Sequence, residues 1–105
     1  MAWVFLILAG LFEVGWAVGL RYSQGFSKAL PSTLTAIAVV LSMYFLALAL
    51  RTLPLGSAYA IWTGIGTVGT ALLGIFLFGE SQDPIRLLFL ALIVIGIVGL
   101  KLVSP

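Results

Sequence analysis

Residues 2–20 read AWVFLILAGLFEVGWAVGL, an apolar run that only Glu13 interrupts. A helix of about 20 residues, rising about 1.5 Å per residue, crosses the roughly 30 Å hydrocarbon core of a membrane. The run is too long for the apolar core of a signal peptide, no basic segment precedes it and no small-residue cleavage site follows it. We therefore expect it to remain in the mature protein as a first transmembrane helix.

Three further apolar runs follow, at residues 32–50, 57–78 and 85–103. The connections between them are short, and Asp83 and Pro84 suit the start of the fourth helix as its cap and first-turn residue. The sequence thus predicts an all-α membrane protein of the inner membrane, with a single four-helix transmembrane domain over residues 1–105.

Composition excludes several classes of protein. Of 105 residues, 63% are hydrophobic and 8% are charged, whereas soluble domains carry about 25% charged residues. Cysteine and histidine are absent, which removes thiolate metal sites, disulfides and the usual neutral-pH proton carrier. The net charge of +2 is too small and scattered for nucleic-acid binding. With no nucleophile–base pair or metal cluster, we expect neither an enzyme nor a bound cofactor.

Basic residues are almost balanced between the two expected sides of the membrane. Arg21, Lys28 and Arg86 fall on one side, and Arg51, Lys101 and the terminal amine on the other. The positive-inside rule needs an asymmetry, so either the small excess fixes one orientation or the chain inserts both ways up. Dual insertion would allow an antiparallel homodimer, an inverted repeat made from two chains. Four short helices also enclose little space, which favours a dimer independently.

Glu13 lies near the middle of the first helix, where an ionised group costs several kcal/mol by disputed amounts. It should therefore face a cavity or a partner. A purely structural ion pair is the alternative, but the basic residues near the membrane lie at helix ends, where they can reach the interface. We expect Glu13 to be the centre of the protein's function.

Helical spacing places Ala9, Gly10, Trp16 and Ala17 beside Glu13. The small residues either leave room beside the carboxylate or pack helices together, and Trp16 offers an aromatic wall.

In the third helix, Tyr59, Trp62, Thr63 and Gly66 share a face. They could supply hydrogen-bond donors to a buried carboxylate, although Tyr59 also suits an interfacial aromatic belt. Ser42, in the second helix, either joins this site or bonds its own helix.

Glycines mark the third and fourth helices. Gly64 and Gly66 permit either close packing or a kink in the third helix, and Gly96 and Gly99 suit a dimer contact in the fourth.

These groups together indicate a site for a small cation. A carboxylate attracts the cation, and aromatic faces add cation–π attraction. Burial and a second copy of Glu13 across a dimer would both favour the protonated carboxyl group. Such carboxyl groups could exchange protons for cations, which is proton-coupled antiport driven by the proton gradient.

Three stretches resemble the small multidrug resistance family: Gly10-Leu11-Phe12-Glu13-Val14-Gly15-Trp16-Ala17, Gly25-Phe26, and Ala58-Tyr59-Ala60-Ile61-Trp62-Thr63-Gly64-Ile65-Gly66. Length and helix layout match over the whole chain. The resemblance implies an antiparallel homodimer that exports cations in exchange for protons. Glu13 would be the shared site, lined by Tyr59 and Trp62, with Ser42 hydrogen-bonded to Glu13 and a kink at Gly64 and Gly66.

Trp16, the Trp62-Thr63-Gly64 sequence and Lys101 resemble the guanidinium-exporter subgroup of that family. Guanidinium is planar and pairs with a carboxylate through parallel N–H donors. The expected partners are thus guanidinium, protons, membrane lipid and a second copy of the chain. Two alternatives stay open: a broader exporter of quaternary ammonium cations, and a small membrane subunit that transports nothing.

Overall fold

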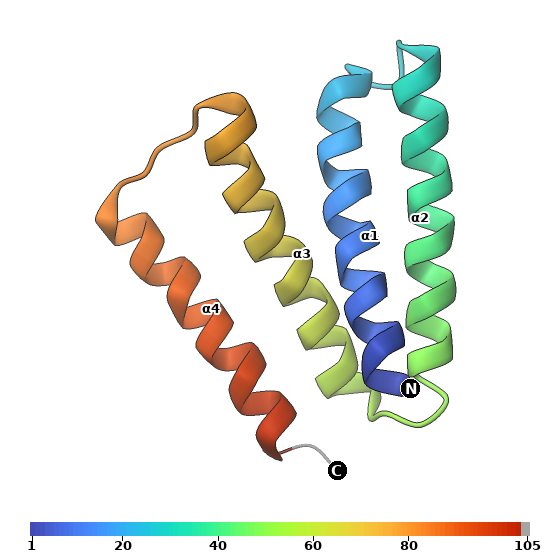
Figure 1. The fold of residues 1–105 in the computed structure, drawn as a ribbon, viewed down its shortest axis with the longest axis vertical. Helices are drawn as coiled ribbons and strands as arrows, with labels where there is room; N and C mark the ends of the chain where they lie inside the picture. Colours follow the sequence, from blue (N-terminus) through green and yellow to red (C-terminus); the bar gives the residue numbers. More distant parts are fainter. Residues whose placement is uncertain (104–105) are drawn as a thin grey trace.

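The computed structural model describes residues 1–103 as four helices (Figure 1). They are α1 (Ala2–Ser23), α2 (Ala29–Ala49), α3 (Leu55–Phe78) and α4 (Pro84–Val103). Each is long and apolar enough to cross a membrane, which confirms the predicted all-helical class. The N-terminus and the end of α4 lie at the same end of the molecule as the α2–α3 connection, and the other two connections lie at the opposite end.

The first connection is shorter than the predicted span of residues 21–31. Helix α1 continues to Ser23, and α2 already begins at Ala29. The chain turns within residues 24–26, all of which have positive φ. The second apolar run was predicted from residue 32, but Pro31 already lies in the first turn of α2, where the helix needs no N–H from proline.

The start of α4 matches its sequence signals. Asp83 Oδ1 accepts a hydrogen bond from the backbone N–H of Ile85 at 2.8 Å, and Pro84 is the first residue of the helix. The predicted cap is therefore confirmed, and it satisfies one of the backbone N–H groups at the start of α4.

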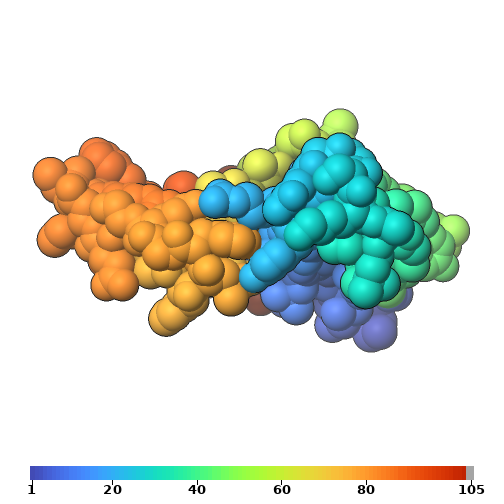
Figure 2. Space-filling view, turned by 90° about the horizontal axis from the view of Figure 1, so that it is seen from above, coloured from blue at the N-terminus to red at the C-terminus, as the bar shows by residue number. Residues whose placement is uncertain are grey.

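The helices form an open layer in the order α2, α1, α3, α4. Backbone contacts join α1 to both α2 and α3, and α3 to α4. Seen from above, α2 and α4 lie at opposite edges (Figure 2). The shortest dimension of the chain is 17 Å, compared with about 10–12 Å for a single helix with side chains. The helices therefore form an open layer little more than one helix thick.

A core fixes α1, α2 and α3 relative to one another. It is formed by buried side chains near the end of the molecule that holds the N-terminus: Leu6, Ala9, Leu46, Ala49, Leu53, Ala58, Ile61 and Trp62. Gly10 allows the close approach of α1 to α3, because a Cβ there would lie 2.6 Å from Ile65 Cγ2. This packing holds α1 and α3 close together in a fixed relative position.

Helix α4 is the least covered element. Within residues 84–103 no side chain is buried. A Cβ added at Gly96 or Gly99 would meet nothing within 4 Å in the described chain. The surface of α4 around Gly96 and Gly99 is therefore open to contact with lipid or with another helix.

Candidate functional site

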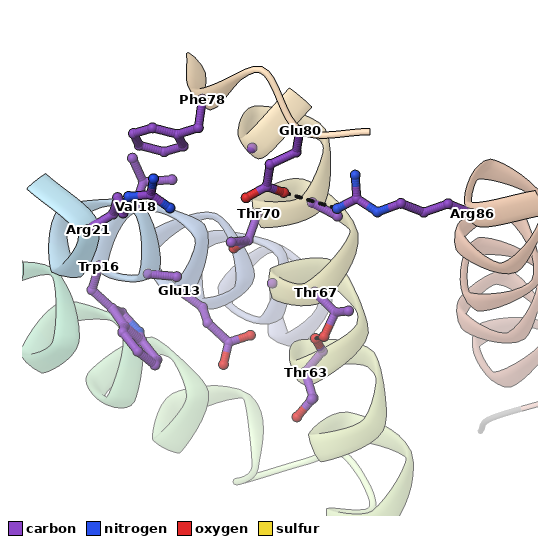
Figure 3. A pocket seen from close by; sticks show the side chains of 14 residues that line it. Glu13, Trp16, Val18, Arg21, Thr63, Thr67, Thr70, Phe78, Glu80 and Arg86 are labelled. Atoms are coloured by element: carbon purple, nitrogen blue, oxygen red, sulfur yellow. Dashed lines mark hydrogen bonds and ion pairs between the residues drawn. The ribbon is translucent and has the colours of Figure 1, made fainter. Parts of the chain in front are cut away.

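A cavity of about 500 Å³ lies between α1 and α3 and extends toward the third connection (Figure 3). Helix α1 contributes one wall and α3 the other, and Glu80 of the third connection and Arg86 of α4 line one end. The lining residues are Glu13, Trp16, Ala17, Val18, Arg21, Thr63, Gly66, Thr67, Thr70, Ala71, Gly74, Phe78, Glu80 and Arg86.

Glu13 reaches from α1 to the backbone of α3. A Cβ at Gly66 would lie 2.7 Å from Glu13 Cγ and would collide with the carboxyl group. The missing side chain at Gly66 therefore makes the space that the Glu13 carboxyl group occupies. The close contact with Glu13 is therefore the reason that a glycine is needed at position 66.

Unsatisfied polar atoms gather at this cavity. Within residues 1–103, four buried side-chain atoms lack a hydrogen-bond partner, and three of them belong to lining residues: Glu13 Oε1, Trp16 Nε1 and Thr70 Oγ1. An unpaired buried polar group costs about 1–3 kcal/mol. Glu13 Oε1 and Thr70 Oγ1 can accept N–H groups of a ligand, whereas Trp16 Nε1 is a donor and needs an acceptor.

Thr63, Thr67 and Thr70 line the α3 wall (Figure 3). Thr67 donates its hydroxyl to the carbonyl of Thr63 at 2.8 Å, as threonines in helices often do. Sequence reasoning selected Thr63 and missed Thr67 and Thr70. Their spacing of four and seven residues from Thr63 was the available signal.

The end of the cavity near the third connection, here called the mouth, is formed by Arg21, Phe78, Glu80 and Arg86. Arg86 Nη2 lies 3.0 Å from Glu80 Oε1, and Arg21 Cζ lies 4.6 Å from the centre of the Phe78 ring. Both arginines lie at helix ends, as expected, but sequence reasoning did not place them at the site.

A second group of predicted residues lies apart from the cavity lining. Ser42 donates its hydroxyl to the carbonyl of Ala9 at 2.7 Å and accepts from Trp62 Nε1 at 3.1 Å. A hydroxyl has one proton, so the implied hydrogen bond from Ser42 to Glu13 is not formed in the described chain. Tyr59 is 53% exposed, and its ring centre lies 5.3 Å from that of Trp62.

The structure therefore brings Glu13, Trp16, Thr63 and Gly66 together at the cavity and leaves Ser42, Tyr59 and Trp62 outside its lining.

Other predicted glycines pack against neighbours. Gly10 contacts Ile65, and a Cβ at Gly64 would lie 2.8 Å from Ile97 of α4. Helix α3 continues without interruption through Gly64 and Gly66, and the kink there stays a prediction.

A profile described as Small Multidrug Resistance protein matches residues 1–93. The chain belongs to this family. It is therefore a multi-pass transporter of the inner membrane and not an enzyme.

Relatives in this family share most of the sequence. A protein named guanidinium exporter from Escherichia coli (strain K12) is 59% identical over 102 residues, which are 97% of each chain. One with the same name from Salmonella typhimurium is 61% identical over 102 residues, again 97% of each chain. A third, from Yersinia pseudotuberculosis, is 58% identical over 104 residues, which are 99% of this chain and 100% of the relative.

Replacing Ser42 tests the role of its hydrogen bonds in this small multidrug resistance protein. Ser42→Ala leaves the buried Trp62 N–H without an acceptor, so we expect the free energy of unfolding in detergent to fall by about 1–2 kcal/mol. Thr33→Ala is the control, because the Thr33 hydroxyl is exposed and bonds its own helix. Equal stability of the two variants would show that the Ser42 bonds do not stabilise the fold.

Proposed function

We propose that this protein exports guanidinium across the inner membrane in exchange for protons, with Glu13 as the shared site. The observation that carries the proposal is that two unpaired buried oxygen atoms able to accept N–H groups, Glu13 Oε1 and Thr70 Oγ1, belong to residues that line one cavity. The names of the relatives, guanidinium exporter, support the choice of substrate.

The chemistry of the cavity suits a small planar cation. A carboxylate accepts two parallel N–H donors from a guanidinium group, and the Trp16 ring offers a face for cation–π attraction. The hydroxyl of Thr70 can accept a further N–H. The bulk of Trp16 narrows the space beside Glu13, which disfavours wide quaternary ammonium ions.

Proton coupling follows if proton and cation compete for one carboxyl group. A proton or a cation each neutralises the charge of Glu13, and an uncompensated charge at this depth is costly. Throughout the transport cycle, the Glu13 carboxyl group would then be bound either to a proton or to a cation. Export of the cation would require the return of a proton.

A second copy of the chain would complete the site. The layer is 17 Å thick, no side chain of residues 84–103 is buried, and the basic residues are nearly balanced between the two ends. We infer an antiparallel homodimer in which α4, with Gly96 and Gly99, packs against its copy. Two Glu13 carboxyl groups would then serve one pathway.

Electrical recordings test the substrate assignment. In proteoliposomes, we expect guanidinium to evoke a proton-driven current and tetrapropylammonium to evoke little. Trp16→Ala should raise the tetrapropylammonium response about tenfold, since a cavity-filling aromatic side chain is removed. A wild-type protein that responds mainly to tetrapropylammonium would instead be the broader exporter.

Cross-linking tests the orientation of the dimer. The chain has no cysteine, and Ile85 and Leu102, near opposite ends of α4, are 63% and 79% exposed. When chains carrying Ile85→Cys are mixed with chains carrying Leu102→Cys, an antiparallel dimer should cross-link one kind to the other. Cross-links only between chains of the same kind would contradict the antiparallel arrangement.

A further inference from the structure

The mouth of the cavity already holds a guanidinium group, that of Arg86. Its Nη2 lies 3.0 Å from Glu80 Oε1, and its Nη1 donates to the backbone carbonyl of Ser81 at 2.6 Å. Two acceptors thus bind two N–H groups of one planar cation. A free guanidinium ion presents the same donors in one plane and can bind the same two acceptors.

Glu80 is held against the wall of the cavity. Gly79 ends α3 with a φ of 65°, and the Glu80 N–H donates to the Gly74 carbonyl at 3.2 Å. A Cβ at Gly74 would lie 2.8 Å from Glu80 Cδ, so the absence of a side chain there admits the carboxyl group. Figure 3 shows Glu80 on the same side of α3 as Thr70, with Glu13 deeper in the cavity.

The charges of the mouth oppose a cation as long as Arg86 stays in place. Arg21 and Arg86 carry two positive charges and Glu80 carries one negative charge, which leaves +1. The Glu80–Arg86 pair is only partly buried, with side chains 41% and 33% exposed. A partly exposed ion pair of this kind contributes little free energy to stability, so it can open easily.

We propose that Glu80 and the Ser81 carbonyl form an outer site for guanidinium at the mouth, and that Arg86 competes for this site until an entering cation displaces it. The proposal rests on the proposed function for the identity of the cation. If the proposal is right, the two partners of this ion pair have opposite effects on the binding of guanidinium. Glu80 strengthens binding, and Arg86 weakens it.

A different result is expected if the ion pair only stabilises the conformation of the third connection. Removing either partner would break the same bond, so both variants would change transport in the same direction. The sign of the two effects therefore separates the two accounts.

The first experiment measures the KM for guanidinium in proteoliposomes at low ionic strength. Glu80→Gln should raise the KM about two- to fivefold and Arg86→Gln should lower it by a similar factor, the size expected for a partly exposed pair. Both effects should shrink in high salt. Lys28→Gln is the control, because Lys28 is exposed at the same end of the molecule and does not line the cavity.

Changes of KM in the same direction for Glu80→Gln and Arg86→Gln, or wild-type KM values in both, would overturn the proposal. If Glu80→Gln does not fold, Gly74→Ala replaces it, since a Cβ there displaces the Glu80 carboxyl group while keeping its charge. Gly74→Ala should likewise raise the KM.

A second measurement does not depend on transport. In Glu13→Gln protein, the ¹⁵N resonance of Arg86 Nε should shift saturably with millimolar guanidinium chloride and not with the same concentration of sodium chloride. No difference between the two salts would overturn the outer site. Absence of guanidinium transport by the wild type would instead count against the proposed function, and the resonance would still test the site.

Discussion

Glu13→Gln is expected to abolish the guanidinium-evoked, proton-driven current in proteoliposomes. The amide keeps the size of the side chain but can neither pair with the cation as a carboxylate nor exchange a proton. Losing hydrogen bonds to a charged group costs about 1.5–3 kcal/mol, which corresponds to a roughly 10- to 150-fold weaker affinity. The loss of proton exchange stops the cycle even at saturating guanidinium.

Glu13→Asp is the matched control for this prediction. It keeps the carboxyl group on a side chain one methylene shorter, so we expect a reduced but measurable current. Both variants should elute from size-exclusion chromatography like the wild type. A wild-type current in folded Glu13→Gln would mean that the cation crosses the membrane without this residue.

Gly66→Ala should have the second largest effect, although it adds only one methyl group. The new Cβ would occupy the place of the Glu13 carboxyl group. Because a carboxyl group at the end of a flexible side chain can move aside, we expect the protein to fold with Glu13 displaced. A displacement of about 1 Å at a reacting group can reduce rates about 100-fold, and we expect the guanidinium current to fall at least tenfold.

Gly56→Ala provides the comparison in the same helix. A Cβ at Gly56 meets nothing within 4 Å in the described chain, so this variant should transport like the wild type. Transport rates and thermal unfolding of both variants should be measured side by side. Equal currents would show that the space at Gly66 is not needed for Glu13 to work.

The four helices and Glu13 could be predicted because their signals are local. An apolar run of membrane-spanning length needs no knowledge of its neighbours, and a carboxylate within it is conspicuous. Helix ends were less accurate, since Pro31 is compatible with a first helical turn as well as with a connection.

The arrangement of the site could be predicted only in part. In a membrane, apolar residues cover both the packed and the lipid-facing sides of a helix, so periodicity does not reveal which side faces a neighbour. The order of the helices in the layer decides that Ser42 bonds Ala9 and Trp62. It also brings Thr70 to the cavity that Glu13 lines. The spacing of Thr70 from Thr63 places both threonines on one face of α3, but it does not show that Glu13 of α1 lies opposite that face.

The claim that one carboxyl group exchanges a proton for guanidinium is tested most directly by proton release on binding. Guanidinium chloride is added to purified protein in weakly buffered detergent solution near neutral pH, and the change in pH is compared with that produced by sodium chloride. We predict saturable proton release from the wild type and none from Glu13→Gln. Binding without proton release in the wild type, or equal release from both proteins, would contradict the account.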